Sequence, residues 1–434
     1  MPSVPTAPGR LPLLGHLPRL ARDPLDFLAR QRALGDLVRV YLGPRPVHVV
    51  YSPDLVRRVL ATDAAKFQRG KVFRTARALL GDGLATADDP VHRHQRRVVR
   101  PAFQRERITA YAEVMREQAE LVSGSWRPGR VVHAEREMAE LALTTTARAL
   151  FRTGLGQAAV AEVHRSLTPV LNGVTGRALL PDPLGALPTP GNRRFRDSLH
   201  RLVSIVDDMV ARYRASGTDH GDLLSTLVAT HHSDAEVRAQ VLNLLMAGTE
   251  TTATTLTWAL YQLAASPEAT ARLSAELAAE LGERPVTAAD LPRLGYLDRV
   301  LTEVLRLRTP VWLLMRTTVA PVRLAGAELP PGTEVLVVPP VLHRDPALYP
   351  APLAFHPDRW LAPEADTWRR TRLFAFGAGA HHCVGDGFAR TEMAIALATI
   401  HRRWHVRLAP GARVRERTRA FLKPTGVSLL VDPR

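Results

Sequence analysis

The pattern of hydrophobic and polar residues alternates between helical and strand periods along this 434-residue chain. A short helix is predicted over Asp23–Leu34. The alternating residues 38–51, interrupted by a Gly-Pro-Arg-Pro turn, predict a β-hairpin. From about residue 53 to residue 308 the apolar positions recur at helical spacing, with Pro- and Gly-rich breaks at 127–129 and 181–191. Strand-like patterns return at 322–324, at 335–338 and within 412–432. The pattern therefore predicts a mainly α protein with small β-sheets.

No internal repeat, low-complexity tract or long linker divides the chain. We therefore predict a single domain over residues 1–434, although the length alone would allow two or three. The hydrophobic content of 46% and the charged content of 23% are ordinary for a globular protein with a substantial core. We also expect a monomer.

The formal net charge of +16 raises the question of nucleic-acid binding. The arginines are spread along the chain, and their densest group alternates with apolar residues between 93 and 107. Zinc-finger spacing, heptad arrays and aromatic RNA platforms do not accompany them. The charge thus favours acidic protein partners or buried anionic groups over nucleic acid.

A single cysteine excludes an intramolecular disulfide and suits a reducing compartment. The N-terminal segment lacks the apolar run of about 18 residues that a membrane span requires. Charged and histidine side chains at Arg10, His16, Arg19 and Arg22 interrupt it. We therefore expect a cytoplasmic protein without a membrane span.

The sharpest chemical signal surrounds that cysteine. Residues 376–385 form a glycine-rich segment that precedes a strongly helical stretch, Thr391–Trp404. Such a turn places Cys383 near a helix N-terminus, where backbone N–H groups and the helix dipole favour a thiolate, and a thiolate is a good iron ligand. Considered alone, a lone cysteine is more often a small buried hydrophobe. The His-His-Cys run also suggests zinc, but a second ligand pair at finger spacing is missing.

The segment resembles the haem-binding signature of the cytochrome P-450 family, Phe-x-x-Gly-x-Arg/His-x-Cys-x-Gly. The matching residues are Phe376, Gly379, His381, Cys383 and Gly385. His381 stands where arginine is commoner. The resemblance implies that Cys383 ligates the iron of haem b, and that Gly379 and Gly385 let the backbone approach the flat macrocycle.

A second segment resembles the oxygen-binding stretch of the same family. Ser233 begins a capping box for a helical pattern that runs to about Ala265, long enough to cross the whole protein. Its middle reads Ala-Gly-Thr-Glu-Thr-Thr over 247–252, and glycine and threonine are poor helix-interior residues. The resemblance implies cofactor contacts at Ala247 and Gly248 and catalytic roles in proton delivery for Glu250 and Thr251.

Further motifs follow in the family's order, so the resemblance covers nearly the whole chain. They comprise two groups, one expected to bind the haem propionates and one expected to form a structural ion-pair network. The propionate ligands are expected at His92, Arg96 and Arg316, and the network at Glu303, Arg306 and Arg359.

The resemblance implies the cytochrome P-450 fold, with haem between the long helix and the cysteine loop, and a monooxygenase that uses O2. Electrons are expected from NAD(P)H through a ferredoxin reductase and a ferredoxin. Longer stretches, including residues 81–103 and 311–320, resemble bacterial sesquiterpene oxidases such as pentalenene oxygenase and albaflavenone monooxygenase. We therefore expect oxidation of a cyclic sesquiterpene in antibiotic or other natural-product biosynthesis.

Other functions remain open at this stage. A macrolide, a steroid or a fatty-acid-like molecule is the alternative substrate. A peroxygenase of the same fold would use hydrogen peroxide, but such enzymes tend to lack the acid–alcohol pair found at Glu250 and Thr251. A haem-binding sensor without catalysis would not need that pair either.

Overall fold

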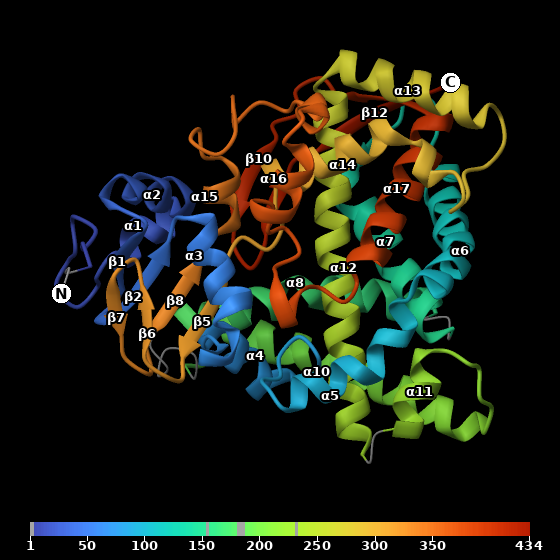
Figure 1. The fold of residues 1–434 in the computed structure, drawn as a ribbon. Helices are drawn as coiled ribbons and strands as arrows, with labels where there is room; N and C mark the ends of the chain where they lie inside the picture. The colour runs from blue at the N-terminus through green and yellow to red at the C-terminus, as the bar shows by residue number, and fades with distance from the viewer. Residues whose placement is uncertain (1–3, 153–155, 180–186, 231–232) are drawn as a thin grey trace.

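The computed structural model describes residues 4–152, 156–179, 187–230 and 233–434. Helices form the larger part of the molecule, and the main sheet lies at one side of them (Figure 1). The prediction of a mainly α protein with small sheets is therefore confirmed. Of the predicted break at 181–191, residues 181–186 lie outside the described part.

The helical body is built around one long helix, α12, which crosses the molecule (Figure 1). It packs most extensively against α7, and α8 packs on α10 while α17 packs on α6. The main helices are α4 (Lys71–Leu80), α5 (Val91–Val99), α6 (Arg105–Gly124), α7 (Ala134–Phe151), α8 (Gln157–Leu179), α10 (Pro190–Ser216), α11 (Leu223–Thr230), α12 (Asp234–Ala264), α13 (Pro267–Leu281), α14 (Gly295–Leu307) and α17 (Asp386–Arg403).

Shorter helices line the sheet and the loops before the cysteine. The helix expected over Asp23–Leu34 is present as α2, with Asp23 as its N-cap, followed by a 3-10 turn. The short helix α1, which precedes it, was not predicted. The short elements are α1 (Leu17–Arg22), α2 (Pro24–Gln31), α3 (Pro53–Arg57), α15 (Pro339–His343), α16 (Ala365–Thr371), the 3-10 turns η1 (Arg32–Leu34), η3 (Ala64–Lys66), η4 (Arg100–Phe103), η5 (Leu291–Arg293), η6 (Pro357–Leu361) and η7 (Gly379–His381), and the π-helical turn η2 (Arg58–Thr62).

The five-stranded sheet joins segments that are far apart in the sequence. The predicted hairpin is present as β1 (Leu37–Leu42) and β2 (Arg45–Val50). The strand order is β1-β2-β8-β5-β3, with β2 and β8 parallel and the other pairs antiparallel. The remaining strands of this sheet are β3 (Phe67–Arg69), β5 (Leu314–Thr318) and β8 (Glu334–Val337).

Three smaller sheets complete the β structure. The strand predicted at 322–324 pairs with its neighbour and not with 335–338, which joins the main sheet. The C-terminal strands were expected as short pieces and are found so. The three small sheets are β4 (Val131–His133) with β12 (Ser428–Pro433) and β9 (Trp404–Leu408), β10 (Arg415–Thr418) with β11 (Leu422–Thr425), and β6 (Val322–Leu324) with β7 (Ala327–Leu329).

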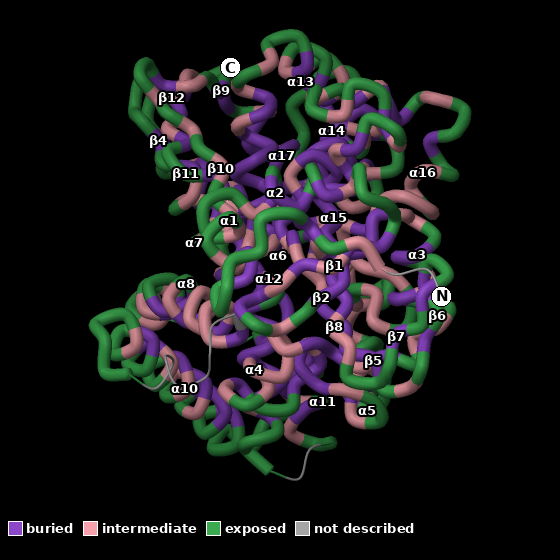
Figure 2. Tube along the Cα trace, turned by 90° about the vertical axis from the view of Figure 1, so that its left-hand side faces the viewer, coloured by how far each residue is buried: buried purple, intermediate pink, exposed green. Residues whose placement is uncertain are grey.

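The hydrophobic core follows this division between helices and sheet. One large cluster of buried side chains fills the space among the helices, and the two faces of the main sheet contribute to two separate clusters. Alternation along the strands causes this separation, because Val335 and Val337 enter one cluster and Leu336 enters the other. Figure 2 shows the buried positions concentrated inside the chain trace.

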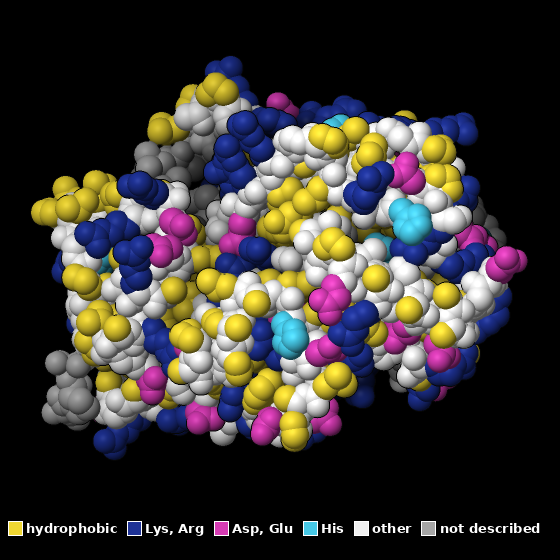
Figure 3. All heavy atoms as spheres, turned by 90° about the horizontal axis from the view of Figure 1, so that it is seen from above, with side chains coloured by type: hydrophobic (Ala, Val, Ile, Leu, Met, Phe, Trp, Pro, Cys, Tyr) yellow, Lys and Arg dark blue, Asp and Glu magenta, His cyan; other side chains and the backbone are white. Residues whose placement is uncertain are grey.

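Charged side chains are distributed over the surface. In the view of Figure 3, Lys and Arg side chains are scattered with Asp and Glu among them. Within the described residues, no helix combines the length and the apolar composition needed to cross a membrane.

Candidate active site at the cysteine loop

The cysteine loop is fixed by its own backbone and by the helix that follows it. The N–H of Cys383 donates to the carbonyl oxygen of Phe376 at 2.9 Å, which closes the loop. Helix α17 begins at Asp386, earlier than the predicted start at Thr391, with Gly385 as its N-cap. Cys383 therefore lies two residues before the N-cap and close to the helix N-terminus, as predicted.

Of the two loop glycines expected to approach the macrocycle, Gly379 is also required by packing within the protein, whereas no close contact among the described residues restricts Gly385. Gly379 has φ +69°, and a Cβ atom there would come within 2.2 Å of the carbonyl oxygen of Leu60. A Cβ at Gly385 would meet Phe103 and the Cys383 sulfur only at 3.6–3.9 Å. Gly379 is thus required by the packing of η7 on η2 and by its left-handed backbone. The expected close approach of Gly379 to a macrocycle stays a prediction.

The protonation of Cys383 is set by its surroundings more than by the helix. Solvent reaches the residue, but protein atoms surround the sulfur on most sides. This desolvation raises the pKa of Cys383 to about 11, although a hydrogen bond from the Gly385 backbone and the charge of Arg96 act in the opposite direction. The Gly385 N–H at the helix start favours the thiolate, in the expected direction, but burial has the larger effect on this pKa. Coordination to a metal cation would favour the anionic sulfur.

Two buried arginines lie side by side on the main sheet. Arg69 on β3 and Arg316 on β5 are direct cross-strand partners, so their side chains leave the same face of the sheet. Both residues are nearly inaccessible, with exposed fractions of 7% and 6%. Burial, and then the charge of Arg316, lowers the pKa of Arg69 to about 9. Burial lowers the pKa of Arg316 to about 10.

The predicted histidines join this pair of arginines. The rings of His92 and His381 lie with centroids 4.0 Å apart. The Arg69 guanidinium is 3.2 Å from His381 Nδ1 and also donates to the carbonyl oxygens of Leu84 and Ala87. Burial, and then Arg69, lowers the pKa of His92 to about 4 and that of His381 to about 2. Both imidazoles are therefore neutral at pH 7 and have N–H groups to donate.

Arg96 lies between this cluster and the cysteine loop. Its Nη1 donates to the carbonyl oxygen of His382 at 2.7 Å, so α5 is tied to the residue next to Cys383. The prediction brought together His92 and Arg96 of α5, Arg316 of β5 and His381 of η7, and the structure places all four around one region. Sequence reasoning missed Arg69, because a lone arginine in a three-residue strand matches no motif. Only the pairing of β3 with β5 places it beside Arg316.

The cluster has the chemistry of a site for carboxylates. Charged groups are costly to bury unless they are paired. Arg69 is buried under the opposing influences of Arg316, which lowers its pKa, and of Asp88 and Asp89, which raise it, whereas Asp88 raises the pKa of Arg316. Guanidinium groups bind carboxylates in a bidentate manner. The residues present therefore fit a prosthetic group that carries two carboxylates next to a metal ligated by Cys383, which is the arrangement of haem.

Helix α12 has one accessible patch in its buried middle. From Ala239 to Leu263 every residue is buried except Ala247, Gly248, Thr251 and Tyr261. The Thr251 hydroxyl donates to the carbonyl oxygen of Ala247 at 2.7 Å, the back-bonding that threonine makes within helices. Ala247 and Thr251, one turn apart, thus form the accessible face of the predicted oxygen-binding stretch.

Gly248 and Glu250, in the same stretch of α12, contact neighbouring elements of the protein. A Cβ at Gly248 would lie 2.9 Å from the Thr146 hydroxyl, so this glycine allows α12 to approach α7. The Glu250 carboxylate forms an ion pair with Lys423 of β11 and accepts a hydrogen bond from Thr168 of α8 at 3.1 Å. Glu250 and Thr251, predicted as an acid–alcohol pair, therefore have different partners in this structure.

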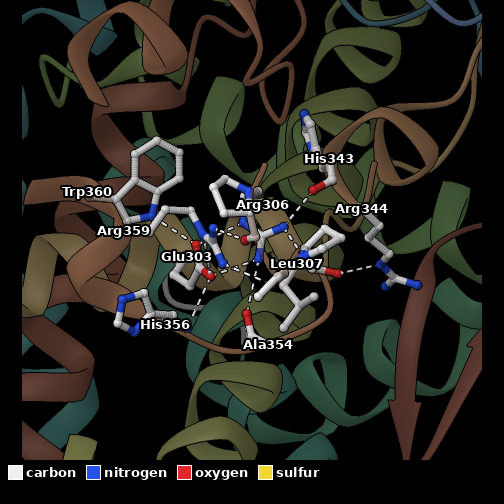
Figure 4. A network of polar contacts seen from close by, with 12 residues as sticks. Glu303, Arg306, Leu307, His343, Arg344, Ala354, His356, Arg359 and Trp360 are labelled. Carbon is white, nitrogen blue, oxygen red and sulfur yellow. Dashed lines mark hydrogen bonds and ion pairs between the residues drawn. The ribbon is translucent and has the colours of Figure 1, made fainter. Parts of the chain in front are cut away.

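The predicted ion-pair network is present and completely buried (Figure 4). Glu303 and Arg306 of α14 are joined through both carboxylate oxygens at 2.8 and 2.9 Å. Arg359 of η6 donates to the same carboxylate at 3.2 Å, and the Trp360 indole donates to it at 3.0 Å. Arg306 also donates to the carbonyl oxygens of His343, Pro352 and Ala354. The network fixes the segment that leads into the cysteine loop.

The protein is mainly helical, its solvent-accessible cysteine lies just before a helix, and its buried cations are arranged for two carboxylates. These features define the class of haem-thiolate proteins. The chain belongs to the cytochrome P450 family, whose model matches residues 5–431. The prediction of this family and of its fold is confirmed. Membership implies haem as the cofactor, O2 as co-substrate and electrons from reductase partners, and it makes the chain a P450 monooxygenase.

Several curated proteins are similar to this chain over almost its whole length. Cyclooctatin synthase and cyclooctat-9-en-7-ol 5-monooxygenase, both from Streptomyces melanosporofaciens, are 45% and 43% identical to it. Pentalenene oxygenase from Streptomyces avermitilis is 39% identical. Each alignment covers 99% of this chain and 95% of the relative.

Proposed function

We propose that this chain inserts an oxygen atom from O2 into an unactivated C–H bond of a cyclic terpene, in natural-product biosynthesis. The observation that carries the proposal is the presence in one chain of the reachable Cys383 and the accessible Ala247–Thr251 patch on α12. The substrate class is supported by the names of the relatives, which describe oxidation of pentalenene and of a cyclooctat- ring system. A cyclic sesquiterpene is the first substrate to test, followed by larger cyclic terpenes and their alcohols.

The proposed roles follow from the geometry. Cys383 would ligate the iron, with Phe376, Gly379 and Gly385 shaping its loop. Arg69, His92, Arg96, Arg316 and His381 would hold the propionates, and Ala247 and Thr251 would contact the distal side. Gly248 is better explained as the point where α12 contacts α7. When bound, the haem supplies oxygen activation and the oxidation of the C–H bond. Glu250 and Thr251 would move protons to the site.

A ferredoxin is the proposed electron donor, reduced by an NAD(P)H-dependent reductase in the cytoplasm. Helix α5 supports this proposal, because its inner residue Arg96 touches the cysteine loop while Arg93, Arg97 and Arg100 are exposed on its outer side. A basic surface of this kind, next to the metal ligand, complements an acidic partner. We further propose that residues 1–434 act as one domain, since the family match spans 5–431.

The test is a spectral titration of the haem-loaded protein with a panel of compounds, followed by turnover. The panel contains cyclic sesquiterpenes, larger cyclic terpenes and their alcohols, a macrolide, a steroid and a fatty acid. We expect a low-to-high-spin shift with a cyclic terpene, and a product that carries one atom of 18O from 18O2 when NADPH, ferredoxin and reductase are supplied.

Three outcomes would overturn the proposal. A spin shift confined to the macrolide, steroid or fatty acid would replace the substrate class. Haem binding without any oxygenated product, from every compound tested, would favour a sensor. Faster turnover with hydrogen peroxide alone than with the redox partners would identify a peroxygenase.

A further inference from the structure

A five-residue loop close to the start of the described chain exposes three leucines. Leu11, Leu13 and Leu14 are 46%, 86% and 52% exposed. In the residues that follow, Leu17 and Leu20 pack against one of the two core clusters of the main sheet. A single exposed leucine is normal in a protein, whereas three within four positions form an apolar patch, and such patches mark interaction sites. We call residues 11–15 the leucine loop.

The leucine loop is held firmly at its base. Leu11 and Gly15 exchange two backbone hydrogen bonds of 2.9 Å, which close the loop. Gly15 has φ +58°, and a Cβ atom there would come within 2.4 Å of the Gly43 carbonyl oxygen in the β1–β2 turn. His16, the next residue, accepts a hydrogen bond at Nδ1 from the Tyr41 N–H at 2.9 Å. The base of the loop is thus attached to β1 and to the β1–β2 turn, and its tip is left in solvent.

The tip of the loop has a backbone conformation that favours other residue types. Leu13 has φ +57°, in the left-handed region where glycine and asparagine are the common residues. A leucine there costs backbone strain, and its exposed side chain gains little from packing within the protein. Neither the local conformation nor the core therefore explains a leucine at this position. Contact with an apolar partner outside the chain would explain it.

Positive charge surrounds the leucine loop. The first 22 residues of the sequence contain three arginines and no acidic residue. These arginines, Arg10, Arg19 and Arg22, are all exposed, and Arg10 lies over the Tyr41 ring at 3.7 Å from its centroid. The next charged residue along the chain, Asp23, is the N-cap of α2. At the left edge of the molecule in Figure 3, hydrophobic side chains gather with Lys and Arg side chains close to them.

An apolar tip beside several arginines suits the surface of a lipid bilayer better than a protein. Stable protein interfaces bury about 800 Å² per partner on surfaces of matching shape, whereas this patch consists of three side chains on one projecting loop (Figure 1). Leucines at a bilayer surface are buried at the boundary between headgroups and acyl chains. Arginines beside them are attracted to anionic lipids. The loop offers both kinds of contact.

We propose that the leucine loop inserts into the surface of a bilayer that contains anionic lipids, with Arg10, Arg19 and Arg22 at the level of the headgroups. The binding is peripheral and reversible, since three leucines bury far less apolar surface than a spanning helix. A bilayer is also where an apolar molecule accumulates, so the loop would bring the enzyme to its substrate. That last step rests on the proposed function, whereas the binding to lipid does not.

The first experiment measures binding to vesicles without substrate or redox partners. Haem-loaded protein is floated with vesicles of phosphatidylcholine alone and with mixed vesicles that contain one third phosphatidylglycerol. We expect binding to the mixed vesicles, weakened by salt because salt screens the attraction between charges. Leu13→Asn/Leu14→Ser should lower the partition coefficient by at least about tenfold, because it removes two of the inserted side chains. Asparagine tolerates the backbone of position 13, so this variant should keep the Tm and the haem spectrum of the parent.

Further variants separate the apolar contribution from the charge contribution. Arg10→Gln/Arg22→Gln should lower binding to the mixed vesicles by about fivefold per arginine and leave binding to phosphatidylcholine unchanged. Leu121→Ser/Leu353→Ser is the matched control, because it changes two other exposed leucines, on α6 and in the segment before η6. This control should bind both kinds of vesicle as the parent does.

The second experiment distinguishes insertion from adsorption. Leu14→Cys is labelled with a fluorophore that responds to the polarity of its surroundings, and the parent treated in the same way gives the background from Cys383. With mixed vesicles the label should become brighter and emit at a shorter wavelength, because it moves from water to the acyl boundary. The same label on Leu353→Cys should not change.

Lack of binding to the mixed vesicles would overturn the proposal, as would equal binding by the parent and Leu13→Asn/Leu14→Ser. Self-association that depends on these leucines, seen by ultracentrifugation of a protein that does not bind vesicles, would identify a second copy of the chain as the partner instead. None of these measurements requires turnover. A wrong substrate class would therefore leave them unchanged, and the two failures can be distinguished.

Discussion

At the scale of single residues, burial decides the chemistry more than sequence neighbours do. Burial lowers the pKa of Arg69, His92, Arg316 and His381, and neighbouring positive charges lower those of Arg69, His92 and His381 further. Cys383 has a raised pKa for the same desolvation reason. Each shift disfavours a charged side chain in the absence of a partner. A group that brings two carboxylates and a metal cation to this region would stabilise both the buried arginines and the cysteine thiolate.

Glu392 on α17 offers a test of this principle away from the cysteine. It is 1% exposed, and burial raises its pKa well above the ordinary 4.5, with the Thr145 hydroxyl acting in the opposite direction. The folded protein keeps this proton after the unfolded chain has lost it. Its contribution to stability is therefore fully present below pH 4.5 and is lost as pH rises toward the folded pKa, by about 1.4 kcal/mol per pH unit.

We predict that Glu392→Gln removes this dependence. The Tm of the variant, measured by calorimetry between pH 5 and pH 9, should fall less with pH than the Tm of the parent. Glu117→Gln, at an exposed position of α6, is the matched control and should follow the parent. Parallel curves for the parent and Glu392→Gln would show that Glu392 is ionised in the folded protein.

At the scale of elements, the Glu303 network connects α14 to the segment before the cysteine loop. One carboxylate serves two buried guanidinium groups and an indole (Figure 4). We predict that Glu303→Gln lowers the free energy of unfolding by about 3–5 kcal/mol, because two buried cations lose their counter-charge. Urea unfolding of the haem-loaded protein measures this change.

The same helix provides the control. Asp298 is half exposed and pairs with Arg369 at 3.0 Å on the surface. Asp298→Asn should cost less than about 1 kcal/mol, as exposed pairs do. Equal losses in the two variants would mean that the network is not what stabilises this part of the molecule.

Helix α5 carries the prediction about the redox partner. Charge reversal at Arg97 and Arg100, both exposed, should raise the KM for ferredoxin by about tenfold and weaken the salt dependence of reduction, because the complex loses favourable charge contacts. Stopped-flow reduction at several ionic strengths measures both effects. Arg22→Glu on α1, also exposed, should leave reduction unchanged. A similar loss in all three variants would indicate a general effect of net charge.

At the scale of the whole molecule, cofactor binding and folding are coupled through buried charge. Haem removal should lower the Tm, since a ligand that binds only the folded state stabilises it. Part of the apoprotein's instability should come from Arg69 and Arg316, which lie together on one face of the sheet. The difference in Tm between loaded and apo protein should therefore be smaller in Arg69→Met/Arg316→Met than in the parent.

Thermal unfolding of the two forms by circular dichroism checks this expectation. Arg57→Met, an exposed arginine on α3, is the control. An unchanged difference in the double variant would mean that the two arginines do not respond to the cofactor. Faster loss of haem from the double variant to an excess of apomyoglobin should accompany the smaller difference, by about 10- to 100-fold for hydrogen bonds to charged groups.

Much of the fold could be read from local pattern. The hairpin at β1 and β2, the capping box at Ser233 and the extent of α12 were predicted closely, because turn chemistry, caps and helical period are local properties. The pairing of strands was not. The strands predicted at 322–324 and 335–338 belong to different sheets, and the pattern did not indicate this because pairing depends on long-range packing.

The sequence by itself determined the family and the order of the motifs, and it singled out Cys383 as the candidate metal ligand, because these are carried by residue types at fixed spacing. Only the tertiary structure decided which side chains share an environment. Arg69 joins the basic cluster through the pairing of β3 with β5. Gly248 allows α12 to approach α7 closely. Lys423 forms an ion pair with Glu250 although the two residues are far apart in the sequence. Burial and electrostatic interaction act through space, and a linear pattern does not contain those distances.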